Sequence, residues 1–264
     1  MRRAGDAGPV LSGGVARVAA GILDAGADLL SLLLPLDCVG CGGDSGAGRE
    51  RRGLCDTCAD ELAGEALRRD PTPCPAGLPP CIAVSAYAGV VRSSILALKE
   101  QGLWSLARPL GRALAGSVVG CPSVGCSSVG DSAGVVLVPV PSSRAAIRAR
   151  GDDPLALMTR HAARILRAQG RRVEIIPALV QRRRRLDQSG LDSHARQANL
   201  ADSLVVGRYQ RRLRERACRH WVCVLVDDIV TTGATLSEAA RALREVGIEP
   251  VACAVIAATR RRGG

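Results

Sequence analysis

One segment near the C-terminus constrains the fold of this chain more than any other. Val222–Val226 is a run of five apolar residues, followed by Asp227 and Asp228 and then by the small, hydroxylated stretch IVTTGAT. A helical pattern begins at Leu236. A fully apolar run of this length is typical of a strand that is buried on both faces of a parallel sheet. The order of strand, turn and helix therefore predicts an α/β domain.

The same alternation continues through most of the chain. Apolar runs predict strands at 82–87, 135–140, 173–176, 221–226 and 250–257, and helices at 90–99, 106–119, 154–169 and 236–246. Strands that alternate with helices predict a parallel sheet. Aromatic residues make up only 2% of the chain and Phe is absent, so we expect a core of Leu, Val, Ile and Ala.

The turn after the apolar strand has the chemistry of a phosphate site. Backbone N–H groups at a helix N-terminus point at an incoming anion, and the helix dipole favours negative charge. The hydroxyl groups add donors, and a glycine lets the backbone approach closely. We therefore predict a 5-phosphate site at Thr231, Thr232, Gly233, Ala234 and Thr235. The alternative is a capped strand–turn–helix without a ligand.

Two adjacent carboxylates would repel a phosphate, so Asp227 and Asp228 need another partner. Ribose hydroxyls suit them, because a carboxylate accepts hydroxyl protons well. One phosphate and one ribose diol together describe a 5-phosphoribosyl group. We therefore predict a ligand of the 5-phosphoribosyl pyrophosphate (PRPP) type.

Two basic segments and one lysine complete the predicted site. The segment VPVPSSRAAIRARG at 138–151 predicts a pyrophosphate turn built from Ser142, Ser143, Arg148 and Arg150, since Arg binds phosphate through two parallel hydrogen bonds. The alternative there is a solvated basic helix start. Lys99 is the only lysine beside 35 arginines, and we predict that it faces the pyrophosphate. The alternative is that this one lysine remains by chance and has no function, because most lysine positions tolerate arginine.

Residues 181–200 are strongly polar and contain four successive arginines. We predict a lid that closes over the site and excludes water, with Gln188, Arg196 and Asn199 as its contacting residues. A basic loop without this role is the alternative.

The N-terminal part carries two CxxC pairs, separated by 13 residues. Four thiolates favour a tetrahedral structural zinc site, so Cys38, Cys41, Cys55 and Cys58 are the predicted ligands. The spacing of Cys74 and Cys81 argues against a second metal.

Residues 14–34 look apolar, but their polar side chains recur at helical spacing and predict an amphipathic helix rather than a membrane span. We therefore expect no membrane insertion and a cytoplasmic location. The expected organisation is an N-terminal tail and helix at 1–34, a zinc ribbon at 35–70, a linker at 71–81 and a larger domain at 82–264.

The segment VLVDDIVTTGAT resembles the PRPP signature of the type I phosphoribosyltransferases. The motif order Cys pairs, ALKEQG, VPVPSSR, DQSGL…ARQANL and VDDIVTTGATLSEAARAL is similar to that of the ComF family, which consists of competence-associated proteins. The resemblance implies an α/β, parallel-sheet type I phosphoribosyltransferase fold preceded by a small zinc ribbon, with Mg²⁺ accompanying PRPP. Two departures stand out: Thr231 replaces the Asp of purine-salvage members, and DDP follows Gly151 where many members have RGFNQ.

The leading hypothesis is a PRPP-binding phosphoribosyltransferase-like protein that transfers 5-phosphoribosyl to a nitrogen nucleophile, in competence or in nucleotide metabolism. The alternatives are a PRPP sensor and a non-enzymatic DNA-uptake component with competence proteins as partners. A formal charge of +11 suits either phosphorylated small molecules or nucleic acid. For single-stranded DNA, the arginines at 182–185 and 208–219 would follow the backbone. A homo-oligomer is compatible with all three, and the sequence names neither acceptor nor general base.

Overall fold

The computed structural model describes residues 37–43, 53–122, 124, 134–143, 147–148, 151–182, 203–219 and 221–259. The predicted helix at 14–34 lies outside these residues. So do Arg150 and the predicted lid residues Gln188, Arg196 and Asn199.

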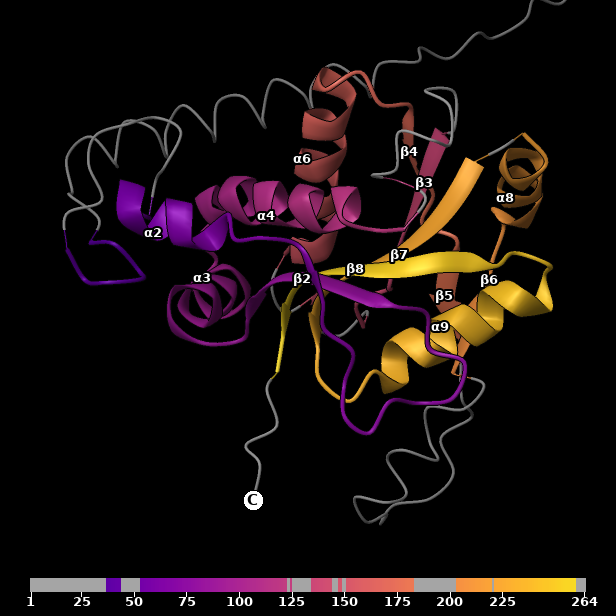
Figure 1. Ribbon diagram of the computed structural model, residues 1–264, viewed down its shortest axis with the longest axis horizontal. Helices are drawn as coiled ribbons and strands as arrows, with labels where there is room; N and C mark the ends of the chain where they lie inside the picture. Colours follow the sequence, from indigo (N-terminus) through magenta and orange to yellow (C-terminus); the bar gives the residue numbers. More distant parts are fainter. Residues whose placement is uncertain are drawn as a thin grey trace, which may run out of the picture.

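A six-stranded sheet forms the centre of the fold, in the order β1-β2-β8-β7-β3-β4 (Figure 1). The five strands from β2 to β4 in this order run parallel, and β1 pairs antiparallel with β2 at one edge. The predicted fold class, an α/β domain with a mostly parallel sheet, is therefore confirmed. The strands are β1 (Leu67–Arg68), β2 (Cys81–Ala86), β3 (Gly134–Pro139), β4 (Val173–Ile175), β7 (Trp221–Val230) and β8 (Pro250–Ala258).

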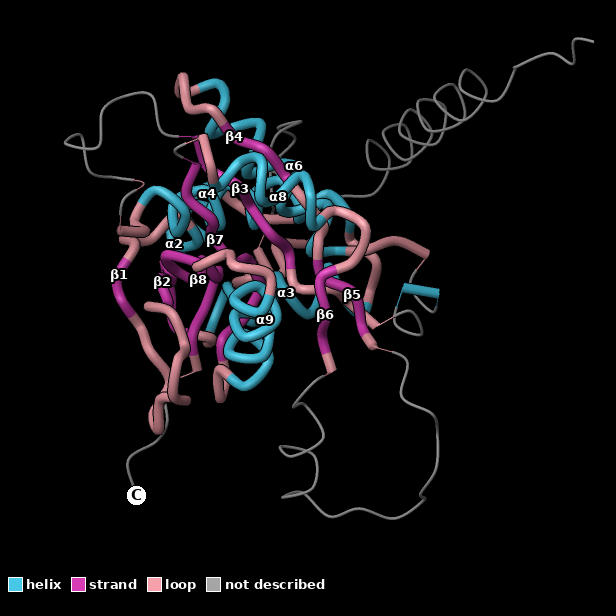
Figure 2. Tube along the Cα trace, turned by 90° about the vertical axis from the view of Figure 1, so that its right-hand side faces the viewer, coloured by secondary structure: helices cyan, strands magenta, loops and turns pink. Residues whose placement is uncertain are grey.

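Helices cover both faces of the sheet. The connection from β2 to β3 contains α3 (Gly89–Glu100), η1 (Trp104–Leu106) and α4 (Ala107–Val119), and α6 (Pro154–Ala168) joins β3 to β4. The helix α9 (Ala234–Glu245) joins β7 to β8, which lies on the other side of β7 from β3. Because parallel crossovers are right-handed, connections that run in opposite directions along a sheet cover opposite faces. Accordingly, α4 and α6 lie on one side and α9 on the other (Figures 1 and 2).

Smaller elements complete the described part. The helix α2 (Asp56–Leu62) precedes β1 and contacts α3 and α4. The strands β5 (Leu179–Gln181) and β6 (Leu204–Val206) form an antiparallel pair, and β6 contacts α9. The helix α8 (Gln210–Ala217) contacts β7. Within the described residues, no helix has both the length and the apolar character that crossing a membrane requires.

The buried core is aliphatic, as the composition predicts. Val224, Leu225 and Val226 of β7 and Leu110 and Leu114 of α4 are fully buried. Their burial on both sides of the sheet explains why the central strands read as continuous apolar runs.

One charged side chain inside this core holds β6 against α9. The carboxylate of Glu238 is buried and accepts hydrogen bonds from the backbone N–H of Leu204 and from the guanidinium of Arg241, at 2.7–3.0 Å. A buried charge needs such partners to be tolerated.

Candidate functional site

The strand order places a topological switch point at the carboxyl ends of β3 and β7. The chain leaves β7 toward β8 and leaves β3 toward β4, so neighbouring strands send their connections to opposite sides. Ligands of open parallel sheets bind at such switch points. The backbone N–H of Val140 donates to the carbonyl of Val226 at 3.0 Å, which holds the segment after β3 beside the part of β7 that leads into Asp227 and Asp228. The segment after β3 and the two carboxylates of β7 therefore lie at the same end of the sheet.

Asp228 carries a charged side chain at the carboxyl end of β7. Its side chain is 11% exposed, and one carboxylate oxygen makes an ion pair with the ammonium of Lys99, from the last turn of α3. The two residues lie far apart in the sequence and on different elements. Lys99 therefore lies at the predicted site, where it contacts a carboxylate.

Asp227 lies beside this pair in a different electrostatic environment. Its Oδ1 accepts a hydrogen bond from the backbone N–H of Asp228 at 2.9 Å. Burial raises the pKa of the Asp227 carboxyl from 3.8 to about 7, with Lys99 acting to lower it and the Asp153 carboxylate acting to raise it further. A carboxyl group with this pKa exchanges its proton near neutral pH, and it accepts ligand hydroxyls best when ionised.

The loop after β7 turns sharply into α9. Gly233 has φ of 74°, a left-handed conformation that favours glycine, and it is the residue from which α9 begins. Thr231, Thr232 and Thr235 around it are exposed. The loop thus presents hydroxyl groups to solvent next to the N-terminus of a 12-residue helix, which is an arrangement that binds anions.

The proline-rich segment at 71–80, which we call the proline strap, packs on this loop. A Cβ atom on Gly233 would lie 2.7 Å from Leu78 Cδ2 and 2.9 Å from Pro71 Cγ. Two hydrogen bonds hold the strap along α9, from Ser237 Oγ to Ala76 O at 3.4 Å and from Arg244 Nη1 to Gly77 O at 2.6 Å (Figure 1). The segment expected to be a linker therefore covers one side of the loop. The domain boundaries themselves remain a prediction.

The turn after β3 contains a residue that the sequence analysis did not single out. Asp153 caps α6 by accepting from the N–H groups of Leu155 and Ala156, and Pro154 occupies the first turn. Ser142 donates its hydroxyl to the same carboxylate at 3.1 Å. The DDP departure is thus a helix cap, and its carboxylate also acts to raise the pKa of Asp227. An Asp-Pro pair before an apolar periodic run was the available signal.

The remaining predicted pyrophosphate residues are placed as follows. Ser143 and Arg148 are exposed, and Ser142 is half-buried. These positions do not test whether the three side chains contact pyrophosphate, so that role stays a prediction.

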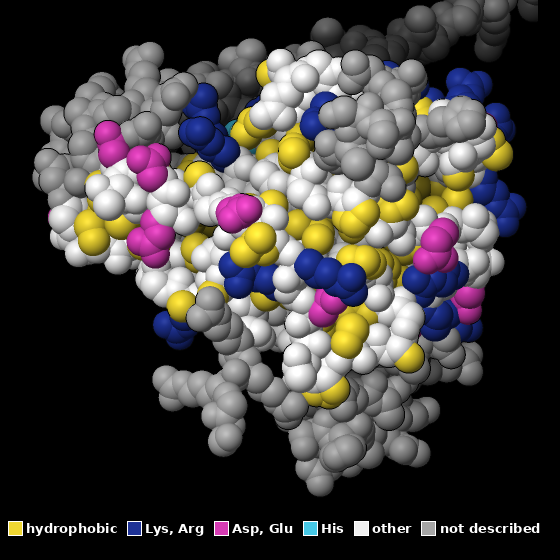
Figure 3. Space-filling model, in the orientation of Figure 1, with side chains coloured by type: hydrophobic (Ala, Val, Ile, Leu, Met, Phe, Trp, Pro, Cys, Tyr) yellow, Lys and Arg dark blue, Asp and Glu magenta, His cyan; other side chains and the backbone are white. Residues whose placement is uncertain are grey.

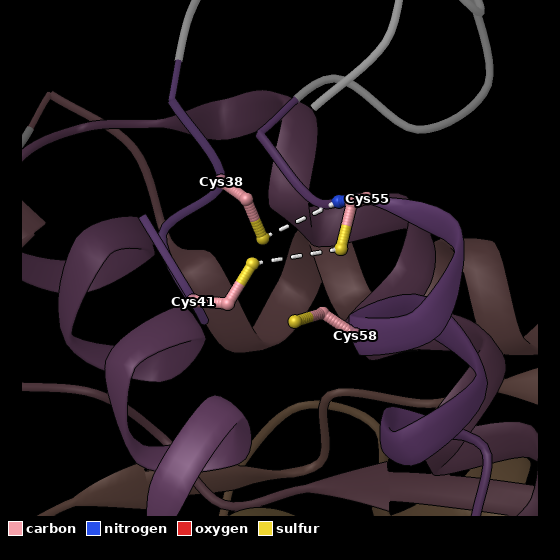
Figure 4. A group of neighbouring side chains, drawn as sticks. All are labelled: Cys38, Cys41, Cys55 and Cys58. Atoms are coloured by element: carbon pink, nitrogen blue, oxygen red, sulfur yellow. Dashed lines mark hydrogen bonds between the residues drawn. The ribbon is translucent and has the colours of Figure 1, made fainter. Parts of the chain in front are cut away.

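The four predicted zinc ligands converge on one point (Figure 4). The Sγ atoms of Cys38, Cys41, Cys55 and Cys58 all lie within 4.8 Å of one another, and those of Cys41 and Cys55 are 3.7 Å apart. Thiolates placed 2.3 Å from a tetrahedral zinc are separated by about 3.8 Å. The cluster can therefore hold zinc, and it is the one four-cysteine group among the residues described.

The thiols of the cluster differ in their electrostatics. Burial acts to raise the pKa of Cys38, but backbone N–H groups of Cys55, Cys41 and Gly40 outweigh it and lower that pKa to about 6. The Cys55 N–H donates to Cys38 Sγ at 3.3 Å. Burial and hydrogen bonds with the neighbouring thiols raise the pKa of Cys58. The lowered pKa favours the thiolate form of Cys38, beside three further thiols. This arrangement suits a metal cation, which displaces the thiol protons when it binds.

The described cysteines outside the cluster are free thiols. Cys81 is buried in β2, whereas Cys74 is exposed in the strap. Burial raises the pKa of Cys121 and of Cys223 to about 12, which leaves both as small apolar core residues.

The comparisons with known proteins agree with this geometry in the C-terminal part. The family described as "Phosphoribosyl transferase domain" matches residues 158–264, a stretch that includes β7, the glycine loop and α9. The C-terminal part of the chain is therefore a phosphoribosyltransferase domain.

Two curated relatives share a shorter stretch. The chain is 56% identical over 34 residues to the transcriptional regulator GfcR of Methanococcoides burtonii, covering 13% of this chain and 17% of the relative. It is 50% identical over 40 residues to GfcR of Halorubrum lacusprofundi, covering 15% and 19% respectively. The chain thus matches less than one fifth of each regulator's length.

Proposed function

We propose that this protein binds PRPP at the carboxyl edge formed by β7 and β3. The observation that carries the proposal is the order of groups after β7: two carboxylates at the strand end, a hydroxyl-rich loop turning at a left-handed glycine, and the N-terminus of α9. Carboxylates suit the ribose hydroxyls and the helix N-terminus suits the 5-phosphate. The matched phosphoribosyltransferase domain covers all three groups.

In this proposal Asp227 and Asp228 accept the ribose hydroxyls, and the loop at 231–235 surrounds the 5-phosphate. Ser142, Ser143, Arg148 and Arg150 would contact the pyrophosphate. Lys99 would contribute its positive charge from the position it takes on Asp228. Mg²⁺ would arrive with PRPP as part of the ligand, bound to pyrophosphate and ribose oxygens, which are the hard donors this ion prefers.

The binding proposal is tested by isothermal titration of the full chain with PRPP and Mg²⁺. Replacing either carboxylate by an amide removes a charge-assisted hydrogen bond, worth about 1.5–3 kcal/mol, so Asp227→Asn or Asp228→Asn should weaken binding about 10- to 150-fold. Asp60→Asn makes the same charge change at an exposed position on α2 and is the control. Absence of PRPP binding by the wild-type chain would remove the proposal.

The reaction that the domain supports is transfer of the 5-phosphoribosyl group. A nitrogen lone pair would form the new bond to the anomeric carbon, the bond to pyrophosphate would break, and the nitrogen would lose its proton. Release of pyrophosphate in the presence of a panel of nucleobases and amines measures this activity. A sensor that binds PRPP without turnover is the second candidate, supported by the partial similarity to transcriptional regulators. Tight PRPP binding without pyrophosphate release would favour the sensor.

We further propose membership of the ComF family and a cytoplasmic location, on the motif order and the four-cysteine cluster. The related DNA-uptake hypothesis concerns the arginines at 182–185 and 208–219. Residues 183–185 lie outside the described residues, whereas 208–219 include α8, where basic side chains gather at the right of the view (Figure 3). Arg211 is 92% exposed there and pairs with Glu215, and Arg212 and Arg216 pair with Glu174. Steep salt dependence of single-stranded DNA binding, lost in Arg208→Ala/Arg211→Ala, would support this hypothesis.

A further inference from the structure

The four-cysteine cluster and the carboxylate pair lie at opposite ends of one helix, α3. At the N-terminal end, a Cβ atom on Gly40 would lie 3.0 and 3.1 Å from the two methyl groups of Val90, in the first turn of α3. It would also lie 2.8 Å from Cys58 Sγ. The loop that carries two of the thiols therefore rests directly on α3, without space for one additional methyl group.

The second pair of thiols is attached to the same end of α3 through α2. A Cβ atom on Gly89, the first residue of α3, would lie 3.5 Å from Glu61 Oε1 of α2, so α2 lies against the first turn of α3. The helices α2 and α3 contact each other. Both halves of the cluster thus pack on the first turn of one helix.

The C-terminal end of α3 reaches the site. The helix has 12 residues, which corresponds to about 18 Å of length. Ile95 and Leu98 are buried along it, and Lys99 in its last turn makes the ion pair with Asp228. A continuous, packed helix moves as a unit, so a shift of its first turn changes the position of the Lys99 ammonium.

We propose that the metal held by the four cysteines positions Lys99 on Asp228 through α3, so that metal occupancy sets the affinity of the ribose site. Lys99 is then a positioning residue, which acts on the ligand through the carboxylate. Loss of the metal leaves four thiols without their common partner and frees the loop at 38–43 from Val90. The second half of the proposal rests on the PRPP function, whereas the link between the cluster and Lys99 does not.

The single lysine allows the link to be measured without any ligand. Protein labelled with ¹³C,¹⁵N-lysine gives one side-chain Cε–Nζ signal, because Lys99 is the only lysine in the chain. We expect this signal to move on removal of zinc by a chelator, toward its position in Asp228→Asn, where the ion pair is lost. An unchanged signal in zinc-free protein that retains its amide spectrum would overturn the proposal.

Two variants keep the test decisive where zinc-free protein unfolds. Gly40→Ala overpacks the contact with Val90, and Val90→Ala opens it from the other side. Gly43→Ala is the control, since its Cβ atom would meet only Cys41 Sγ at an ordinary 3.5 Å. Zinc content is measured by metal analysis in each variant. We expect the Lys99 signal to move in Gly40→Ala and Val90→Ala at full zinc occupancy, and to stay in place in Gly43→Ala. A signal that stays in place in all three would overturn the link.

The effect on ligand affinity is measured separately by titration with PRPP and Mg²⁺. Coupling between sites commonly changes affinity by about 5- to 150-fold, and we expect about fivefold weaker binding in Gly40→Ala, because Lys99 is one of several groups at the site. In a Lys99→Gln background the same substitution should have no further effect. If no variant binds PRPP but the lysine signal still responds to zinc, the PRPP function fails and the link through α3 stands. If a variant with a displaced Lys99 signal binds PRPP as tightly as the wild type, the claim that metal occupancy sets affinity is overturned.

Discussion

Substitution of Gly233 by alanine tests whether the proline strap and the glycine loop fit together as the structure indicates. Two costs add at this position. The residue has φ of 74°, and an L-residue in the left-handed region costs roughly 1–2 kcal/mol. The new methyl group would also lie 2.7 Å from Leu78 and 2.9 Å from Pro71, and overpacking of this kind typically costs about 1–3 kcal/mol. We therefore expect Gly233→Ala to lower the free energy of unfolding by about 2–5 kcal/mol.

Gly247 provides a matched control at the other end of α9. It has φ of 78°, and a Cβ atom there would meet nothing within 4 Å. Gly247→Ala should therefore show the backbone cost alone, about 1–2 kcal/mol. Urea denaturation of both variants measures the two free energies, and titration with PRPP measures the two affinities. We expect PRPP affinity to fall in Gly233→Ala and to persist in Gly247→Ala. Equal losses of stability would refute the close contact between strap and loop.

Three further predictions concern the charged groups of the fold. Asp227→Asn should gain stability relative to the wild type as the pH rises from about 4 to 7, because the folded protein holds this proton up to a pKa of about 7 whereas the unfolded chain releases it near 3.8. Urea denaturation across this range measures the difference, and a constant difference would contradict the raised pKa. Asp153→Ala should cost about 1 kcal/mol through loss of the α6 cap, and Asp153→Asn should retain most of that stability. In both variants NMR titration should show a lower pKa for Asp227, and an unchanged pKa would exclude the influence of Asp153. Glu238→Gln should lower the free energy of unfolding by about 1.5–3 kcal/mol, since the hydrogen bonds to Arg241 and Leu204 lose their ionic component. A thermal or urea midpoint equal to that of the wild type would contradict this role.

Much of the fold could be predicted because its signals are local. The strands β2, β3, β4 and β8 and the helices α3, α4, α6 and α9 lie within one or two residues of the predicted ranges. An apolar run, a glycine and a helical repeat each act over a few residues, so the sequence alone displays them. The convergence of the four cysteines was predictable for the same reason, since each CxxC pair forms one tight turn.

Other elements were missed or shortened because their stability comes from distant partners. β7 continues past Val226 to Val230, since Asp227 and Ile229 find backbone partners in Val255 and Ala257 of β8. Charged residues after an apolar run indicate the end of a strand, and only the neighbouring strand shows that backbone pairing continues. The short strands β1, β5 and β6 carry too few residues for a recognisable alternation.

The sequence by itself therefore determined the α/β class, the hydroxyl-rich loop with its two carboxylates, and the set of four thiols. Only the tertiary structure decided what stands next to these groups. Lys99 pairs with Asp228, the Asp153 carboxylate acts on the pKa of Asp227, and the strap covers Gly233, although each pair is remote in the sequence. Such contacts follow from the order of strands in the sheet and from the face on which each helix packs, and no local pattern of residues encodes either.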